Sequence, residues 1–251
     1  MQLQANAVRI FVRDLPRALH FYRDDLGLAQ VGGANEVGYW VFSSGSLNLI
    51  VESVDPSDAE ASALLGRFVG LSFRVDDIHQ AVAELKRVGA HISGEPELQA
   101  WGGTLAHFDD PDGNRLSLVQ DSKGSETATA RLEQALLFVK DLPRMRDFYR
   151  GALGLEPLAA LSSEGFCVLA GGAARLALHA IPEHIARGIE ITDPPFERSQ
   201  TPIKLMFQAS DLAALCERVE RHGGRLRPAR DSGSRDAIDP EGNVLSLNAD
   251  R

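Results

Sequence analysis

Apolar side chains recur at helical spacing near the start of the chain. After Asp14 they fall at intervals of three and four residues, at Leu15, Ala18, Leu19, Tyr22 and Leu26. Because one face of a helix repeats every 3.6 residues, this spacing predicts a helix with these residues on its buried stripe. Asp14 fits the N-cap, Pro16 the first turn and Gly27 the C-terminal end of this helix.

The same pattern occurs in two more places. A helix is predicted from the cap Asp77 to Gly89, with its buried stripe at Ile78, Ala81, Val82, Leu85 and Val88. Another is predicted from Asp211 to Gly223, with its buried stripe at Leu212, Leu215, Cys216 and Val219. Short apolar segments between turn residues predict strands, at 8–12, 39–42, 47–51 and 69–75.

One passage of the sequence is repeated in the second half of the chain. Residues 12–28 and 139–155 are identical at 11 of 17 positions, at an offset of 127 residues. Residues 110–118 and 239–247 match in the same way at an offset of 129, and each begins with an Asp-Pro pair. The chain is therefore predicted to be a tandem of two homologous domains.

The domain boundaries follow from the repeat. We expect domains at 1–120 and 131–251, joined by a polar linker at 121–130 that lacks hydrophobic periodicity. The Asp-Pro segments fit type I turns between antiparallel strands, which accounts for their carboxylates without a catalytic role.

Composition narrows the class of partner. The 251 residues carry a formal net charge of -9, which argues against nucleic acid as the main partner. No apolar run approaches the ~20 residues of a membrane span, and residues 1–6 lack the features of a signal peptide. We expect a cytoplasmic monomer or homodimer whose partner is a small molecule, with neither nucleic acid nor a membrane as partner.

The repeated motifs also resemble a known family. The helix Asp-Leu-Pro-Arg…Phe-Tyr-Arg…Leu-Gly-Leu and the Asp-Pro-Asp-Gly-Asn hairpin, in the order strand, helix, strands, resemble the vicinal oxygen chelate superfamily. It includes glyoxalase I, extradiol dioxygenases, fosfomycin-resistance enzymes and bleomycin-resistance proteins. The resemblance implies an α+β fold of four βαβββ modules, at about 1–60, 68–120, 131–180 and 201–249, which form two tandem cupped-sheet domains. It says less about function, because one scaffold hosts unlike chemistries.

The resemblance also implies where a metal would bind. The family places His, Glu or Gln at four inward positions of each cup. In the first cup these positions correspond to Ala7, Asn48, Gly70 and Ser117. In the second cup they correspond to Gln134, Ala177, Lys204 and Ser246. Neither set can hold a divalent cation in the family manner, so we predict no cofactor; a divalent metal is possible but the ligand positions do not support it.

The second cup has more inward polar groups and is the predicted ligand site. We expect Gln134, His179, Lys204 and Gln208 to line it. Lys204 is a candidate to hold a carboxylate or polarise a carbonyl, and His179 is a candidate general base. The alternatives are a rim histidine and a lysine that extends to solvent.

Three residues of the first half are further candidates for ligand contacts. Arg9 and Arg74 are inward polar residues, and either can pair with Glu52 or with a ligand carboxylate. Trp101 begins a strand near the predicted pocket mouth, where it would stack on a flat ligand or pack in the core.

Three functions remain open. The first is a metal-free binder of a small organic molecule, as in bleomycin-resistance proteins. The second is a lyase, isomerase or dioxygenase-type enzyme that uses either an unorthodox metal set, such as His179 with Gln134, or Lys204 and His179 without metal. The third is a sensor or interaction module, for which the sequence supplies no exposed apolar stripe.

Overall fold

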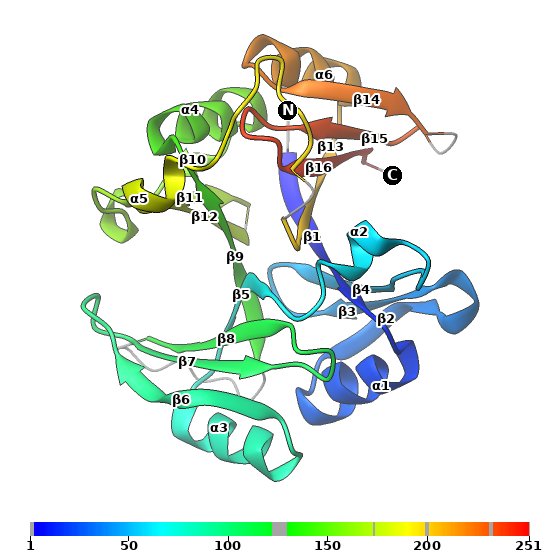
Figure 1. The fold of residues 1–251 in the computed structure, drawn as a ribbon, viewed down its shortest axis with the longest axis vertical. Coiled ribbons are helices and arrows are strands. Elements are labelled where there is room, and N and C mark those ends of the chain that lie inside the picture. The colour runs from blue at the N-terminus through cyan, green and yellow to red at the C-terminus, as the bar shows by residue number, and fades with distance from the viewer. Residues whose placement is uncertain (1–2, 122–129, 173, 199–200, 231–232, 251) are drawn as a thin grey trace. The chain divides into compact units, whose positions relative to one another are not determined.

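The computed structural model describes residues 3–121, 130–172, 174–198, 201–230 and 233–250. Its elements follow one another as the four expected βαβββ modules (Figure 1). Of the predicted linker 121–130, residues 122–129 lie outside the described part of the chain, so its boundaries stay a prediction.

The first half of the chain holds two modules. The first consists of β1 (Leu3–Val12), α1 (Leu15–Leu19), the π-helical η1 (His20–Asp25), β2 (Ala29–Ala34), the 3-10 turn η2 (Asn35–Val37), β3 (Tyr39–Ser43) and β4 (Asn48–Ser53). After the short helix α2 (Ala59–Ser62), the second consists of β5 (Phe68–Arg74), α3 (Ile78–Arg87), β6 (His91–Leu98), β7 (Thr104–Asp109) and β8 (Arg115–Gln120).

The second half repeats this order. Its first module consists of β9 (Arg131–Val139), α4 (Leu142–Leu153), β10 (Glu156–Pro157), η3 (Ala159–Leu161), β11 (Phe166–Gly171) and β12 (Ala174–Ala180). After α5 (Glu183–Ala186), its second module consists of β13 (Lys204–Ala209), α6 (Leu212–Arg221), β14 (Arg225–Ala229), β15 (Arg235–Ile238) and β16 (Val244–Ala249).

The chain divides into two compact units. One comprises Val8–Gln134, and the other comprises Ala135–Arg251 with Met1–Ala7. In the first unit the strand orders are β1-β4-β3-β2 and β5-β8-β7-β6; in the second they are β10-β11-β12-β9 and β14-β15-β16-β13. The two modules of a unit thus lie in different sheets. The sheets are mixed, because β5 and β13 run parallel to β8 and β16 while the hairpins are antiparallel.

The predicted helix signals are confirmed. The side chains of Asp14, Asp77 and Asp211 each accept a hydrogen bond from a backbone N–H of the first turn. The first helix differs from its repeat: it is α-helical only to Leu19 and continues as a π-helix to Asp25. Among the described residues, no helix is long and apolar enough to cross a bilayer.

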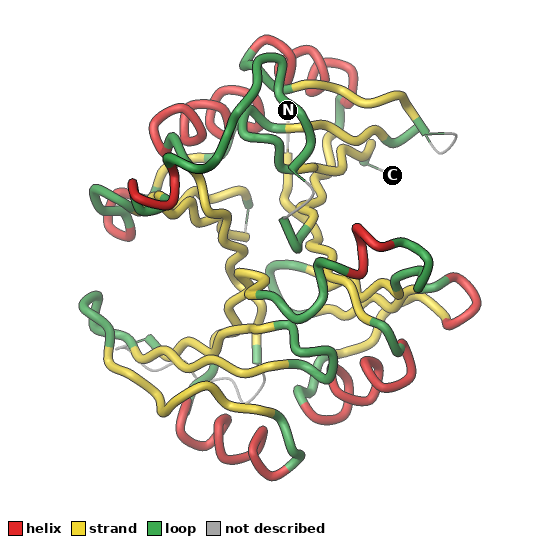
Figure 2. Tube along the Cα trace, viewed as in Figure 1, coloured by secondary structure: helices red, strands yellow, loops and turns green. Residues whose placement is uncertain are grey.

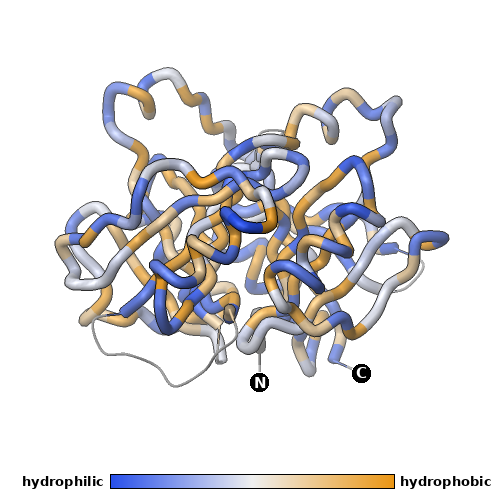
Figure 3. Tube along the Cα trace, turned by 90° about the horizontal axis from the view of Figure 1, so that it is seen from below, coloured by the Kyte–Doolittle hydropathy of each residue, from blue (hydrophilic) through white to orange (hydrophobic). Residues whose placement is uncertain are grey.

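Alternation along the strands separates two faces. Figure 2 shows the long helices α3, α4 and α6 each lying along one side of its strands, and Figure 3 shows hydrophobic residues interleaved with hydrophilic ones along the chain. In β1, Val8, Ile10 and Val12 are buried, whereas Arg9 and Phe11 between them are partly exposed. The buried set forms the core against the helices, and the other set forms what we call the helix-free face.

Each Asp-Pro turn anchors the first helix of its unit. Asp110 accepts hydrogen bonds from the Tyr22 hydroxyl (2.8 Å), the Asn114 amide side chain (2.9 Å) and two backbone N–H groups of the turn. Asp110, Tyr22 and Asn114 are all buried. The turn carboxylate is therefore structural, as its turn chemistry predicts.

Candidate functional site

The candidate site lies on the helix-free face of β13–β16. Leu205 and Phe207 of β13 are buried on the core side, so Lys204, Met206 and Gln208 lie on the other face. Ser246 and Asn248 of β16 are paired with Met206 and Gln208 of β13. Asp236 of β15 is paired with Ser246 on its other side. Lys204, Asp236 and Ser246 are buried. Buried polar residues are uncommon, which makes this face a candidate for ligand binding.

Three charged side chains form the centre of this face. The Lys204 ammonium donates to Oδ2 of Asp236 at 2.6 Å, and the Arg230 guanidinium donates to the same oxygen at 2.5 Å. We call these three residues the Lys204 triad. The side chains of Lys204 and Asp236 are only 9% and 8% exposed, whereas that of Arg230 is 51% exposed.

The two oxygens of the Asp236 carboxylate differ in their hydrogen bonds. Oδ2 of Asp236 accepts from both cations, while Oδ1 is buried and has no hydrogen-bond partner in the described residues. The formal charges of the triad sum to one positive charge. A buried acceptor without a donor is uncommon in folded proteins.

The four residues expected in the second cup do not share one sheet. Gln134 and His179 lie on β9 and β12 of one sheet, whereas Lys204 and Gln208 lie on β13 of the other sheet. The predicted metal positions divide in the same way. In the first half, Ala7 and Asn48 are separated from Gly70 and Ser117; in the second half, Gln134 and Ala177 are separated from Lys204 and Ser246. The reason is that consecutive modules join different sheets, which local sequence patterns do not specify.

His179 is exposed and held between two aromatic rings. It stacks on Phe138 with ring centroids 5.6 Å apart, and it meets the edge of Phe166 at the same distance. This geometry corresponds to the rim histidine that we considered as the alternative to a general base.

The arginines of the first half are engaged with carboxylates of the protein. Arg9 pairs with Glu52 at 2.9 Å and stacks over the ring of Phe11. Arg74 pairs with Asp121 at 2.7 Å and with Glu133 at 2.8 Å. Of the two arginines considered as partners of Glu52, Arg9 forms the pair, and a ligand role for either arginine stays a prediction.

Trp101 lies in the turn between β6 and β7 and is 56% exposed. It is therefore not a core residue, while stacking on a ligand stays a prediction.

Sequence reasoning missed three residues of the helix-free faces. Asp236 and Arg230 complete the Lys204 triad, and His107 lies on β7, where its Nδ1 meets the Ser117 hydroxyl at 3.0 Å. Partial burial lowers the pKa of His107. The signal for His107 was its alternation with the core residues Ala106 and Phe108, whereas contact between Arg230 and Asp236 depends on the hairpin between them.

The donor set does not fit the metal site of the resembling family. Gly70, Ala7 and Ala177 have no donor side chain, and Lys204 places a cation at a ligand position. Across the described residues, no group of three or more His, Cys, Asp or Glu side chains is arranged to hold a metal ion. Hard divalent cations need imidazole or carboxylate donors, so we derive no step through a metal.

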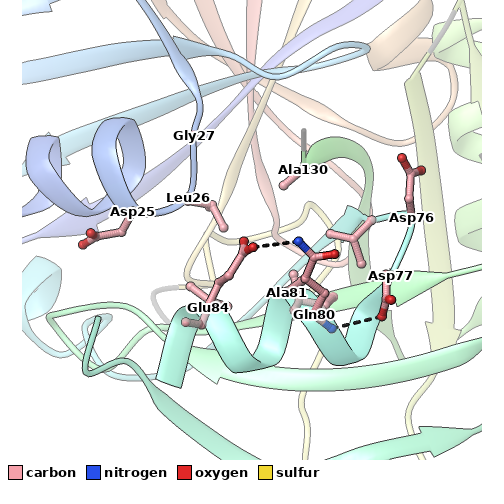
Figure 4. Close-up of a pocket in the computed structure, with 12 residues that line it drawn as sticks. Asp25, Leu26, Gly27, Asp76, Asp77, Gln80, Ala81, Glu84 and Ala130 are labelled. Carbon is pink, nitrogen blue, oxygen red and sulfur yellow. Dashed lines mark hydrogen bonds between the residues drawn. The ribbon is translucent and has the colours of Figure 1, made fainter. Parts of the chain in front are cut away.

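A separate pocket of about 430 Å³ lies in the first unit, beside the helices. Figure 4 shows Asp25 and Leu26 on one side of the pocket and Gln80 and Glu84 of α3 on the other. The Gln80 side-chain amide donates a hydrogen bond to the Glu84 carboxylate. Asp77 on its wall already caps α3. None of the predicted site residues lines this pocket, so it is distinct from the Lys204 triad.

Comparison with known proteins relates each half to one family. The model of the Glyoxalase/Bleomycin resistance protein/Dioxygenase superfamily matches residues 4–118 and 131–247. The uncharacterized protein YraH of Bacillus subtilis is 28% identical over 122 residues, 45% of this chain and 94% of YraH. A bleomycin resistance protein of Klebsiella pneumoniae is 31% identical over 116 residues, 43% of this chain and 86% of that protein.

A solved structure covers both halves together. A glyoxalase I variant from Zea mays has a TM-score of 0.77 with this chain and covers 99% of it, with 94% of its own length matched. The identity is 19%, so this likeness concerns the fold alone.

Proposed function

The chain belongs to the Glyoxalase/Bleomycin resistance protein/Dioxygenase superfamily, and on this premise we propose that it binds a small organic molecule without a divalent metal. The binding site would be the helix-free face of β13–β16, centred on Lys204. Gln208 and Ser246 beside it would supply further hydrogen bonds to the ligand.

The observation that carries this proposal is the contact between Lys204 and Asp236. The buried Lys204 ammonium is fixed at 2.6 Å from the carboxylate, at the position that the resemblance aligns with a metal ligand of the family. A fixed cation of the protein attracts the same oxygen groups of a ligand that a metal would attract, without any metal ligands. The triad therefore supports binding that persists when metals are removed.

The positions of Lys204 and His179 favour a small-molecule binder over an enzyme that uses these two residues without a metal. That enzyme needs Lys204 and His179 at one substrate, but they stand on different sheets of their unit. His179 is also exposed and lies between the rings of Phe138 and Phe166. We therefore take sequestration of a small molecule as the leading function.

The test compares binding with and without metal. The full chain, purified untagged and without chelator, is analysed for metal by plasma mass spectrometry and screened by thermal shift against a library of small organic molecules. We expect hits that persist in EDTA and are lost in Lys204→Met but kept in Lys86→Met, a control at an exposed lysine. A stoichiometric bound metal, or hits that vanish with EDTA, would overturn the proposal and favour an oxygenase or lyase.

A further inference from the structure

We infer that the pocket between η1 and α3 of the first unit binds an organic cation on an aliphatic chain, such as an alkylguanidinium. This pocket lies beside the helices and is separate from the helix-free face of the proposed function. Two features of the molecule support a cation here. One is the composition of the pocket lining, and the other is a guanidinium of the chain at the corresponding place in the second unit.

The pocket combines carboxylates with an apolar wall (Figure 4). Its lining includes four acidic side chains, those of Asp25, Asp76, Asp77 and Glu84, and none of the described residues that line it is basic. Its apolar part consists of side chains that are largely buried, such as Leu26, Val75, Leu85 and Leu118. The volume of about 430 Å³ is in the range of small-molecule sites. A molecule that complements this lining carries a positive charge next to an apolar chain.

The carboxylates of the lining have few charged partners in the protein. Asp77 accepts hydrogen bonds from backbone N–H groups at the start of α3, and Glu84 accepts one from the neutral Gln80 amide at 2.9 Å. Oδ1 of Asp25 lies 3.9 Å from Nε2 of His20, which does not line the pocket. Within the described residues, no Lys or Arg side chain pairs with the carboxylates of the lining. Their negative charge is therefore available to a cationic ligand.

The second unit holds a cation of its own at the corresponding place. The repeat aligns Asp25 with Ala152, and the helices α3 and α6, of ten residues each, align Glu84 with Arg218. Nε of Arg218 on α6 donates to the backbone carbonyl of Ala152 on α4 at 2.9 Å. Ala152 is buried, and the two helices pack together. A guanidinium thus joins the helices in the second unit, whereas acidic side chains face a pocket at the same positions of the first.

The backbone of the first unit also differs at this place. His20–Asp25 is π-helical and ends at the pocket, whereas the aligned residues of α4 continue as an α-helix. π-helical segments are frequent at functional sites. The pocket, its acidic lining and the π-helix therefore distinguish the first unit from its repeat at one and the same place.

A ligand in this pocket would take the role that the Arg218 side chain has in the second unit. Its guanidinium would donate to the carboxylates, because charge-assisted hydrogen bonds are the strongest of their kind. Its aliphatic chain would lie along the apolar wall, as the stem of an arginine lies along apolar surface. Charge and chain should therefore both contribute to binding.

The first experiment compares three small molecules on the unchanged protein. The ¹⁵N-labelled full chain is titrated at low ionic strength with n-butylguanidinium, with n-butylurea, which has a similar shape without the charge, and with guanidinium, which lacks the chain. We expect n-butylguanidinium to bind about tenfold more tightly than n-butylurea, because hydrogen bonds between charged groups are worth more than neutral ones. It should also bind more tightly than guanidinium, and the shifted amides should lie around Leu26 and in α3. Equal affinities of n-butylguanidinium and n-butylurea, no binding of the cation, or shifts confined to other elements would overturn the inference.

Two substitutions at one exposed position then test the comparison between the units. Glu84→Gln removes a carboxylate and keeps the shape, so the affinity for n-butylguanidinium should fall about fivefold. Glu217→Gln, at an exposed position of α6, should leave it unchanged. Glu84→Arg supplies the guanidinium that the second unit already has, and binding should be lost. Circular dichroism checks that each variant is folded. Folded Glu84→Gln and Glu84→Arg variants that bind the cation as tightly as the native protein would contradict the inference.

Discussion

The two units share one scaffold contact and differ in the charges on their helix-free faces. Tyr22 donates to Asp110 in the first unit, and Tyr149 donates to Asp239 in the second, both at 2.8 Å. Each aspartate also accepts from two backbone N–H groups and one asparagine of its turn. The repeat in the sequence is therefore a repeat of the contacts that hold the first helix of a unit to its last hairpin.

We call the contacts of Tyr22 with Asp110 and of Tyr149 with Asp239 the anchors. The anchors are the same in both units, whereas the charges on the helix-free faces differ. In the first unit Arg9 has a partly exposed pair with Glu52, whereas in the second Lys204 and Asp236 are buried together and joined by Arg230. A duplicated domain can change the charges on one face because alternation keeps that face apart from the core. The comparison shows that the contact between the tyrosine and the turn aspartate is common to both units, whereas the charged contacts of the helix-free faces differ.

The largest expected effect concerns the anchors. Asp239→Ala leaves the Tyr149 hydroxyl and the turn donors without their acceptor, so the free energy of unfolding at pH 7 should fall by about 4 kcal/mol. Asp110→Ala should give a smaller loss, because Asp110 is slightly more exposed. Urea unfolding measures both. Losses below about 1 kcal/mol in both variants would show that the anchor is not a main source of stability.

The pH dependence of the second anchor comes next. Burial raises the pKa of Asp239 to about 6, against about 3.9 in the unfolded chain. The folded state therefore binds the proton more tightly, and the stabilisation from this group is complete below pH ~3 and lost as the pH rises through about 6. The stability advantage of the native protein over Asp239→Asn should shrink by roughly 2 kcal/mol between pH 4 and 7.

Urea titrations of both proteins across this range measure that difference, and the other groups cancel between them. Asp110→Asn should show the same direction, because burial also raises the pKa of Asp110. If the stability advantage of the native protein over Asp239→Asn grew with pH, burial would not be the dominant influence on the pKa of Asp239.

A third comparison sets the buried ion pair against the exposed one. Lys204→Met leaves Asp236 with Arg230 alone and should reduce the free energy of unfolding by about 2 kcal/mol. Arg9→Met removes a partly exposed pair and should reduce it by less than about 1 kcal/mol. Thermal or urea unfolding at low and high salt checks both, and only the Arg9 variant should lose its deficit in high salt.

The smallest effect is expected for the tyrosine hydroxyls. Tyr149→Phe and Tyr22→Phe each remove one buried hydrogen bond and keep the ring, so each should cost about 1 kcal/mol. Because the Tyr149 hydrogen bond lowers the pKa of Asp239, Tyr149→Phe should also raise that pKa further. Urea unfolding of Tyr149→Phe as a function of pH measures the pKa shift of Asp239. A simple loss of packing would lower the stability equally at every pH and would not shift that pKa.

The local elements could be predicted because their signals are local. The Asp caps at Asp14, Asp77 and Asp211 and the apolar stripes fixed the three predicted helices, and alternation placed Arg9, Lys204 and Gln208 on the helix-free face. The π-helix at His20–Asp25 was not predicted, because its apolar spacing fits an ordinary helix as well.

The sequence by itself determined the four modules and the tandem repeat. Only the tertiary structure decided which of these modules share a sheet, because strand pairing between modules depends on contacts distant in sequence. It also decided that Lys204 meets Asp236 and Arg230. Strand alternation fixes the face of a side chain, but only the paired strands and their hairpin fix its neighbours.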